Sequence, residues 1–117
     1  MAESILRDKA KTFAKEVVLL YRKLKQNNVE GALINQLLRS GTSVGANVHE
    51  AQYAQGTKDF ISKFEIALKE CNESEYWLEI LYAVNSISKD DFDKYQKDCI
   101  ELRRMLVSTV TTLKKKQ

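Results

Sequence analysis

The chain has 117 residues, of which 44% are hydrophobic and 30% are charged, and its formal net charge is +3. This length suits one domain, and the composition is typical of a globular protein with a buried core. No apolar run approaches the roughly 20 residues that span a bilayer, and the N-terminus lacks the basic and apolar regions of a signal peptide. We therefore expect one cytoplasmic domain.

The spacing of apolar residues predicts four helices, over residues 4–25, 30–54, 57–84 and 89–115. The sequence holds no proline, which permits long helices. Because the connections are short, sequential helices should run antiparallel. The predicted fold is all-α, an antiparallel up-down-up-down four-helix bundle that forms one domain over residues 1–117. The first helix shows the apolar spacing of three and four most clearly, at Leu6, Ala10, Phe13, Val17, Leu20 and Leu24.

Small residues distinguish the second predicted helix from the others. Gly41 and Gly45 lie four residues apart and so share one face. An interior glycine costs about 1 kcal/mol relative to alanine, so we expect another backbone to approach this face closely. The apolar stripe of the same helix is expected to begin at Leu33. Thr57 is the expected N-cap of the third helix and Ser88 that of the fourth.

The third predicted helix carries a second apolar stripe in addition to its core stripe. Ile66, Trp77, Ile80 and Val84 lie opposite Phe64 at about 100° per residue. A helix at the centre of the monomer would explain two apolar faces, and so would burial against another subunit. No helix is central in a four-helix arrangement, so we favour assembly through this stripe.

Positive charge is concentrated in the first and last helices. Residues 1–28 hold seven basic and three acidic side chains, and residues 89–117 hold eight and five. In an up-down bundle these two helices are neighbours, with Arg104 expected near Lys15, so their cations should form one basic ridge. Two interpretations fit it: a solvated surface, or a surface that attracts phosphate backbones. The candidate nucleic-acid-binding residues are Arg7, Lys11, Lys15, Arg22, Lys97, Arg104 and Lys115.

Patterns typical of catalysis or metal binding are missing from the sequence. The single histidine, His49, has no second histidine or glutamate at a ligand spacing, and no glycine-rich phosphate loop follows a predicted strand. We therefore predict no catalytic, cofactor or metal site. Cys71 and Cys99 are expected to be reduced, buried thiols. Glu75 falls within an apolar stripe and should pair with a basic residue or a hydroxyl.

A longer motif spans the second and third helices. It consists of the run Ser43-Val44-Gly45-Ala46-Asn47-Val48-His49-Glu50-Ala51, followed by Asp59-Phe60, Lys63-Phe64, Ala67-Leu68-Lys69-Glu70 and the segment from Glu73 to Leu78. This pattern resembles the four-helix-bundle family of 23S rRNA intervening-sequence proteins, which includes accessory proteins of diversity-generating retroelements.

The resemblance implies several properties of this chain. It implies a homopentameric ring, no enzymatic activity, and for the retroelement relatives a basic surface that engages RNA and a reverse transcriptase. Carried over residue by residue, it implies packing or assembly roles for Ser43, Asn47, Glu50, Glu73, Trp77 and Leu78. Ile80 joins this set through the second apolar stripe. The basic residues are not part of the family motif, so their role rests on charge alone.

Three hypotheses about function follow. The first is a non-enzymatic oligomeric accessory protein that binds structured RNA or a ribonucleoprotein, with a reverse transcriptase or a ribosomal component as partner. The second is a protein-interaction scaffold that does not bind nucleic acid directly. The third, which we favour least, is an enzyme with an unrecognised site around His49 and Glu50.

Overall fold

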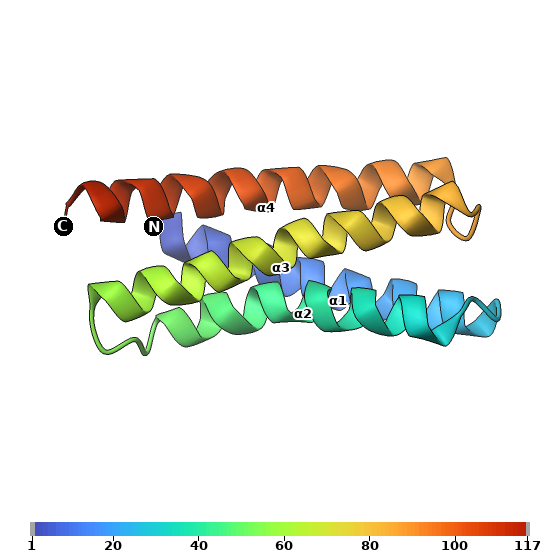
Figure 1. Cartoon of the computed structure of the whole chain (residues 1–117), viewed down its shortest axis with the longest axis horizontal. Helices are drawn as coiled ribbons and strands as arrows, with labels where there is room; N and C mark the ends of the chain where they lie inside the picture. The colour runs from blue at the N-terminus through green and yellow to red at the C-terminus, as the bar shows by residue number, and fades with distance from the viewer. Residues whose placement is uncertain (1, 117) are drawn as a thin grey trace.

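Four long helices form the molecule in a computed structural model, which describes residues 2–116, with side chains from Ser4 onward. They are α1 (Ala2–Gln26), α2 (Gly31–Ala51), α3 (Thr57–Ala83) and α4 (Lys89–Lys115), and no strand occurs within this range. Sequential helices run antiparallel, so the beginning of α1 and the end of α4 lie at the same end of the bundle (Figure 1). The predicted all-α four-helix bundle is confirmed. Over the same residues, no helix is long and apolar enough to cross a membrane.

The apolar stripes of the four helices meet in one core. All six residues of the predicted stripe in α1 are buried, from Leu6 to Leu24. In α2 the stripe begins one residue later than predicted, because Ile34 is buried whereas Leu33 is only partly buried. The bundle is elongated, with extents of 47 × 21 × 20 Å, so every helix runs along its length.

Asparagine residues end α1 and α3 in the same way. Asn28 and Asn85 adopt the left-handed conformation, with φ angles of 58° and 63°. After each, the chain turns back on the helix: the amide N–H of Val29 donates to the carbonyl of Leu24, and that of Ser86 to the carbonyl of Leu81. These bonds satisfy carbonyl groups that the helix end would leave free. Asparagine tolerates this conformation better than most residues, which explains its use at both turns.

The turn between α2 and α3 differs from the prediction. Helix α2 ends at Ala51, not at residue 54, because the amides of Gln52 and Tyr53 bond to carbonyls three residues back. The N-cap of α3 is Gly56, not Thr57, and its φ of 151° is a conformation that favours glycine. Ser88 is confirmed as the N-cap of α4, since its hydroxyl accepts a bond of 3.1 Å from the amide of Asp91.

The two interior glycines face α1, and the predicted close approach of another backbone occurs at Gly45, whereas Gly41 faces a side chain. A Cβ atom on Gly41 would lie 2.9 Å from both γ carbons of Val17. A Cβ atom on Gly45 would lie 3.2 Å from the carbonyl oxygen of Ala10. Side chains at these positions would therefore push the two helices apart.

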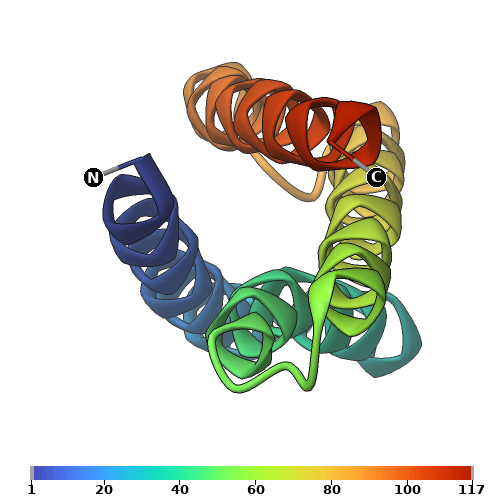
Figure 2. The same ribbon diagram turned by 90° about the vertical axis from the view of Figure 1, so that its left-hand side faces the viewer.

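Helices α1 and α4 are the pair of neighbours that approach least closely. Seen along the bundle, they face one another across the open side of the ring of helices (Figure 2). A buried hydrogen bond of 2.9 Å between the hydroxyls of Ser74 and Ser40 joins α3 to α2 on the opposite side. The bundle is thus closed around α2 and more open between its first and last helices.

Candidate nucleic-acid interface

A basic groove runs between α1 and α2 and has a volume of about 490 Å³. Arg7 and Lys11 form its α1 wall, and Lys15 and Arg22 continue the same face of the helix at spacings of four and seven residues. Small residues among its lining leave room between the two walls. Those residues are Ala14 from α1 and Gly45 and Ala46 from α2.

Helix α2 contributes a neutral, polar wall to this groove. Thr42, His49 and Gln52 line it, and the single carboxylate among the lining residues is Asp8, on α1. The hydroxyl of Thr42 donates to the carbonyl of Leu38 at 2.7 Å, so its oxygen keeps a lone pair for a ligand. An anion that enters the groove therefore meets two cations and one carboxylate on the α1 side and no carboxylate on the α2 side.

A chain of hydrogen bonds fixes the end of the groove. Arg7 has only donors, and its Nη1 donates to Oε1 of Gln52 at 2.8 Å. This contact orients the Gln52 amide, so that Nε2 donates to Nδ1 of His49 at 3.2 Å. In the neutral imidazole the proton then resides on Nε2, and His49 presents an N–H donor away from Gln52.

Tyr53 lies beside this end of the groove, in the turn after α2. Its side chain is 73% exposed, the highest value among the exposed large hydrophobic residues. Its ring contacts that of His49, with 5.7 Å between the ring centroids and an interplanar angle of 60°. His49 is itself exposed. A cationic groove therefore ends at two accessible aromatic rings.

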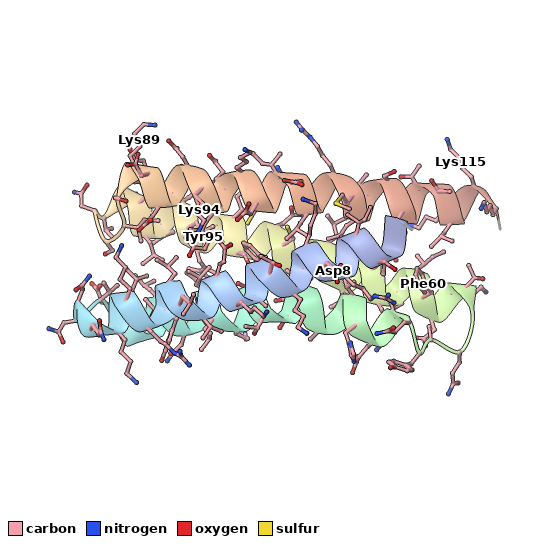
Figure 3. The ribbon with its side chains drawn as sticks, turned by 180° about the vertical axis from the view of Figure 1, so that it is seen from behind. Asp8, Phe60, Lys89, Lys94, Tyr95 and Lys115 are labelled. Atoms are coloured by element: carbon pink, nitrogen blue, oxygen red, sulfur yellow. The ribbon has the colours of Figure 1, made fainter. Side chains whose placement is uncertain are left out.

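The basic residues of α4 occupy a different face of the bundle. Lys97, Arg104 and Lys115 lie at helical spacing on the outer side of α4 and are all exposed. Lys115 extends away from the rest of the bundle (Figure 3). A second groove, of about 470 Å³, lies along this face and contains Lys97 and Arg104 together with Asp93 and Glu101. This face therefore mixes both signs of charge.

A third surface, the α1/α4 seam, separates these two faces and is mainly acidic. Its cavity of about 290 Å³ is lined by Asp8, Lys9, Thr12, Phe13, Glu16, Asp98, Glu101 and Leu102. Lys9 pairs with Glu101 across the seam, and Nζ of Lys94 lies 2.7 Å from the carboxylate of Glu16. Figure 3 shows Lys94 and Tyr95 of α4 beside α1, where the Tyr95 hydroxyl donates to the Glu16 carbonyl at 2.9 Å.

Burial and neighbouring charge shift acid–base equilibria in the seam. Desolvation, with the nearby charge of Glu16, raises the pKa of Asp98 above its ordinary value. Desolvation also raises the pKa of Tyr95. The hydrogen bond from Lys9 lowers the pKa of Glu101. The seam thus holds carboxylates that differ in their tendency to take up a proton.

The prediction of one basic ridge over α1 and α4 is wrong. Adjacent residues of a helix point about 100° apart, so Lys15 turns away from the seam when Glu16 faces it. The expected proximity of Arg104 to Lys15 is wrong for a related reason. Lys94 pairs with Glu16, which places Lys15 level with the first half of α4, about ten residues before Arg104. The cations form two faces with an acidic seam between them.

Ion pairing divides the basic residues into two groups. Eight of them form salt bridges: Lys9, Lys23, Arg39, Lys63, Lys89, Lys94, Arg103 and Lys114. None of the seven candidate nucleic-acid-binding residues forms a salt bridge with a side chain that the structure describes. Their charges are therefore available to a ligand.

Among the family-motif residues, Leu78 is buried in the core, whereas the others lie where α2 meets α3 with side chains at least partly accessible. Asn47 donates to the carbonyl of Ser43 at 2.8 Å, and Glu50 pairs with Lys63 at 3.5 Å. Arg39 joins α2 to α3, with Nη1 2.8 Å from Glu70 and Nη2 in contact with Glu73. Trp77 and Ile80 are partly buried beside these residues.

Two further predictions concern Glu75 and the two cysteines, on α3 and α4. Glu75 pairs with Arg103 at 2.9 Å, which confirms the expected basic partner. Cys71 and Cys99 are confirmed as free, buried thiols, and the Sγ atom of Cys71 donates to the Cys99 carbonyl at 3.3 Å. Hydrogen bonding with Cys71, together with burial, raises the pKa of the Cys99 thiol. Within residues 2–116, no group of histidine, cysteine or acidic residues could hold a metal ion.

Sequence reasoning missed the α2 wall of the basic groove. It extended the second helix to residue 54 and gave no role to Thr42, Gln52 or Tyr53. A signal was present, because residues 42, 46, 49 and 53 recur at spacings of three and four and carry no acid. That spacing did not indicate which neighbouring helix this side of α2 adjoins.

The structure defines a four-helix bundle with two separate basic faces, and comparison with known proteins gives its family. Residues 2–108 match the family described as 23S rRNA-intervening sequence protein, and this chain belongs to that family. A crystal structure from Bacteroides thetaiotaomicron VPI-5482, described as a protein of unknown function from the S23 ribosomal protein family, is 41% identical. The match covers 95% of this chain and 99% of that chain, with a TM-score of 0.92. No curated protein matches the sequence.

Proposed function

We propose that this chain is a non-enzymatic, oligomeric accessory protein that binds RNA or a ribonucleoprotein through the basic residues of α1 and α4. The division of the cations supports the proposal most directly. Eight basic residues are compensated by carboxylates, whereas Lys11, Lys15 and Arg22 share one exposed face of α1 without a carboxylate partner among the described side chains. A face of uncompensated charge suits a phosphate backbone, which releases counterions when cations bind it.

The family supports a ribosomal partner as the first to test. Its name refers to sequences inserted in 23S rRNA, so an RNA hairpin from such an insert is a suitable probe. A reverse transcriptase is the alternative protein partner, which the resemblance to retroelement accessory proteins suggests. In a complex with either partner, the basic surface would contact the phosphate backbone of the RNA.

Charge reversal on α1 tests RNA binding. The Lys11→Glu/Lys15→Glu variant should weaken binding of a labelled RNA hairpin at 50 mM salt about tenfold or more. It should also reduce the slope of log affinity against log salt by about 2. The matched control is Lys58→Glu/Lys69→Glu, which makes the same charge change at exposed residues of α3 outside both basic faces. Fluorescence anisotropy measures both effects. If the wild-type protein does not bind RNA at low salt, the proposal fails and the scaffold hypothesis gains support.

We also propose that the protein assembles as a homopentamer through the outer surface of α2 and α3. Ile66, Tyr76 and Val84 remain exposed there, next to partly buried Trp77. The indole N–H of Trp77 is buried and has no hydrogen-bond partner among the described residues. Monomers seldom expose large contiguous apolar patches, so a subunit contact is the expected cover.

Light scattering tests the assembly. The wild-type protein should have about five times the 13.5 kDa mass of one chain. Trp77→Asp should yield monomer or soluble aggregate, and Ile66→Asp provides a second test at an exposed position that is not needed for folding. Leu19→Asp is the control, since Leu19 is an exposed apolar residue on α1. An unchanged oligomer in both α3 variants would exclude this surface as the interface.

A further inference from the structure

We propose that the groove between α1 and α2 binds single-stranded RNA, with one unpaired base stacked on Tyr53 and the adjoining phosphates held by Arg7, Lys11 and Lys15. This inference rests on the proposed function, because it assumes that the protein binds RNA. It specifies that the RNA is single-stranded, that it lies in the α1/α2 groove and that Tyr53 stacks on one of its bases.

The arrangement of charge supports a strand that follows the groove. Arg7, Lys11 and Lys15 lie about 6 Å apart along the axis of α1, at a rise of roughly 1.5 Å per residue. The facing wall from α2 is uncharged: Thr42 can accept from a ribose 2′-hydroxyl, and the second amide N–H of Gln52 can donate to a sugar or phosphate oxygen. A backbone that follows α1 would meet a row of cations and no opposing carboxylate wall.

The aromatic end of the groove favours a single strand over a duplex. Bases in a duplex are stacked on one another, whereas unpaired bases offer a free face to an aromatic side chain. The Tyr53 ring is 73% exposed, and its partner among the aromatic rings is His49, in a tilted contact. Much of the ring surface therefore remains open to a base.

Hydrogen bonds hold the backbone at Tyr53 and the side chains next to it before a ligand arrives. Its amide donates to the Glu50 carbonyl at 3.0 Å, which holds the backbone of the turn. Next to it, the bonds from Arg7 to Gln52 and from Gln52 to His49 join the cationic wall to the aromatic end. A preformed site loses less conformational entropy on binding than a mobile one. The same network places the free N–H of His49 beside the ring, where a phosphate or base oxygen could accept it.

The α4 face lacks this combination of features. Lys97 and Arg104 share their groove with Asp93, Glu101 and the apolar Ile100. No aromatic residue lines that groove, and carboxylates offset part of its charge. It suits general attraction of a polyanion, whereas the α1/α2 groove has both charge and a stacking surface.

Three substitutions of Tyr53 separate stacking from charge and from simple apolar contact. The probe is a labelled twelve-nucleotide polyadenylate strand, compared with a blunt twelve-base-pair RNA duplex at 50 mM salt. Tyr53→Leu and Tyr53→Ala should weaken binding of the strand about tenfold, because stacking on an aromatic ring is lost. Tyr53→Phe keeps the ring and should bind within about twofold of the wild type. Duplex affinity should change little in all three variants.

A second pair of variants tests the location of the strand. Ala46→Glu places a carboxylate among the lining residues of the groove and should weaken strand binding about tenfold. Ala83→Glu introduces the same side chain at an exposed position at the end of α3 and should have little effect. Circular dichroism confirms that each variant remains helical.

The outcomes distinguish this inference from the proposed function. If the protein binds RNA but Tyr53→Leu and Ala46→Glu bind the strand as tightly as the wild type, the inference is wrong and the proposed function stands. Tighter binding of the duplex than of the strand would also overturn the inference. If neither RNA binds at low salt, both proposals fail.

Discussion

Helix α1 meets its two neighbours in opposite ways. Towards α2, small residues let the helices touch, with Gly45 facing the backbone of Ala10. Towards α4, the helices stay further apart, and Lys9, Glu16 and Lys23 reach across to oppositely charged partners. Steric fit closes the first interface and leaves the charges of α1 free at its edge. At the interface with α4, the basic residues of both helices form ion pairs, and the cavity that remains is lined mainly by acidic residues. One helix thereby supplies a basic groove on one side and an acidic seam on the other.

The largest expected effect comes from filling the close contact with α2. Gly41→Leu should destabilise the protein by about 2–3 kcal/mol, because its side chain overlaps Val17 in a packed core. Gly31→Leu is the matched control, since a Cβ atom there meets nothing within 4 Å. Urea unfolding followed by circular dichroism measures the difference. Equal stability of the two variants would mean that the helices do not touch at Gly41.

An intermediate effect is expected on the α4 side. Lys9→Ala should cost about 0.2–1 kcal/mol, because it removes an ion pair whose side chains are each 43% exposed. The loss should shrink towards zero at 1 M NaCl, where exposed charges are screened. Lys15→Ala serves as the control, because Lys15 lies on the same helix and has no salt-bridge partner among the described side chains. Unfolding curves at low and high salt provide the measurement, and a loss that persists unchanged at 1 M NaCl would contradict an electrostatic contact.

The smallest expected effect concerns the protonation of Asp98 in the seam. Its pKa in the folded protein is raised above the ordinary value of 3.8 by burial and by the charge of Glu16. Between these two pKa values the folded state holds more protons than the unfolded state, so stability falls as the pH rises through this window. At neutral pH Asp98 is ionised, and the free-energy cost of burying its carboxylate is fully present. The charges of Lys9 and Lys94 reduce that cost.

Replacing the carboxyl group tests this sign. Asp98→Asn should raise the unfolding temperature at pH 7 by about 1–3 °C. Below pH 3.8 the folded and unfolded states both hold the proton, so the gain should disappear there. Scanning calorimetry across this pH range measures the trend. A gain that grows as the pH falls would contradict the raised pKa.

The sequence predicts the fold well because each helix carries its own apolar spacing. Leu6 to Leu24 are buried as their spacing indicates, and Gly45 makes the close backbone approach that its cost implies. The basic surface could not be predicted to the same degree. Periodicity shows that Lys15 is on the outside of α1, but not which neighbour lies beside it. The position of Arg104 along the bundle axis relative to Lys15 depends on how α1 packs against α4. No short turn connects these two helices, so the sequence does not fix their register.

Both described ends of the chain lie at the end of the bundle that carries the turn after α2 (Figure 1). Leu113 near the end of α4 lines a hollow with Gln52 and Ala54 of that turn, which confirms that the end of α4 and this turn share one end of the bundle. Arg7 near the start of α1 bonds to Gln52, so a purification tag or dye attached before α1 would sit near the aromatic end of the basic groove. The turn around Asn85, at the far end of the molecule, is the better place for a label, because a reporter there would not compete for the groove.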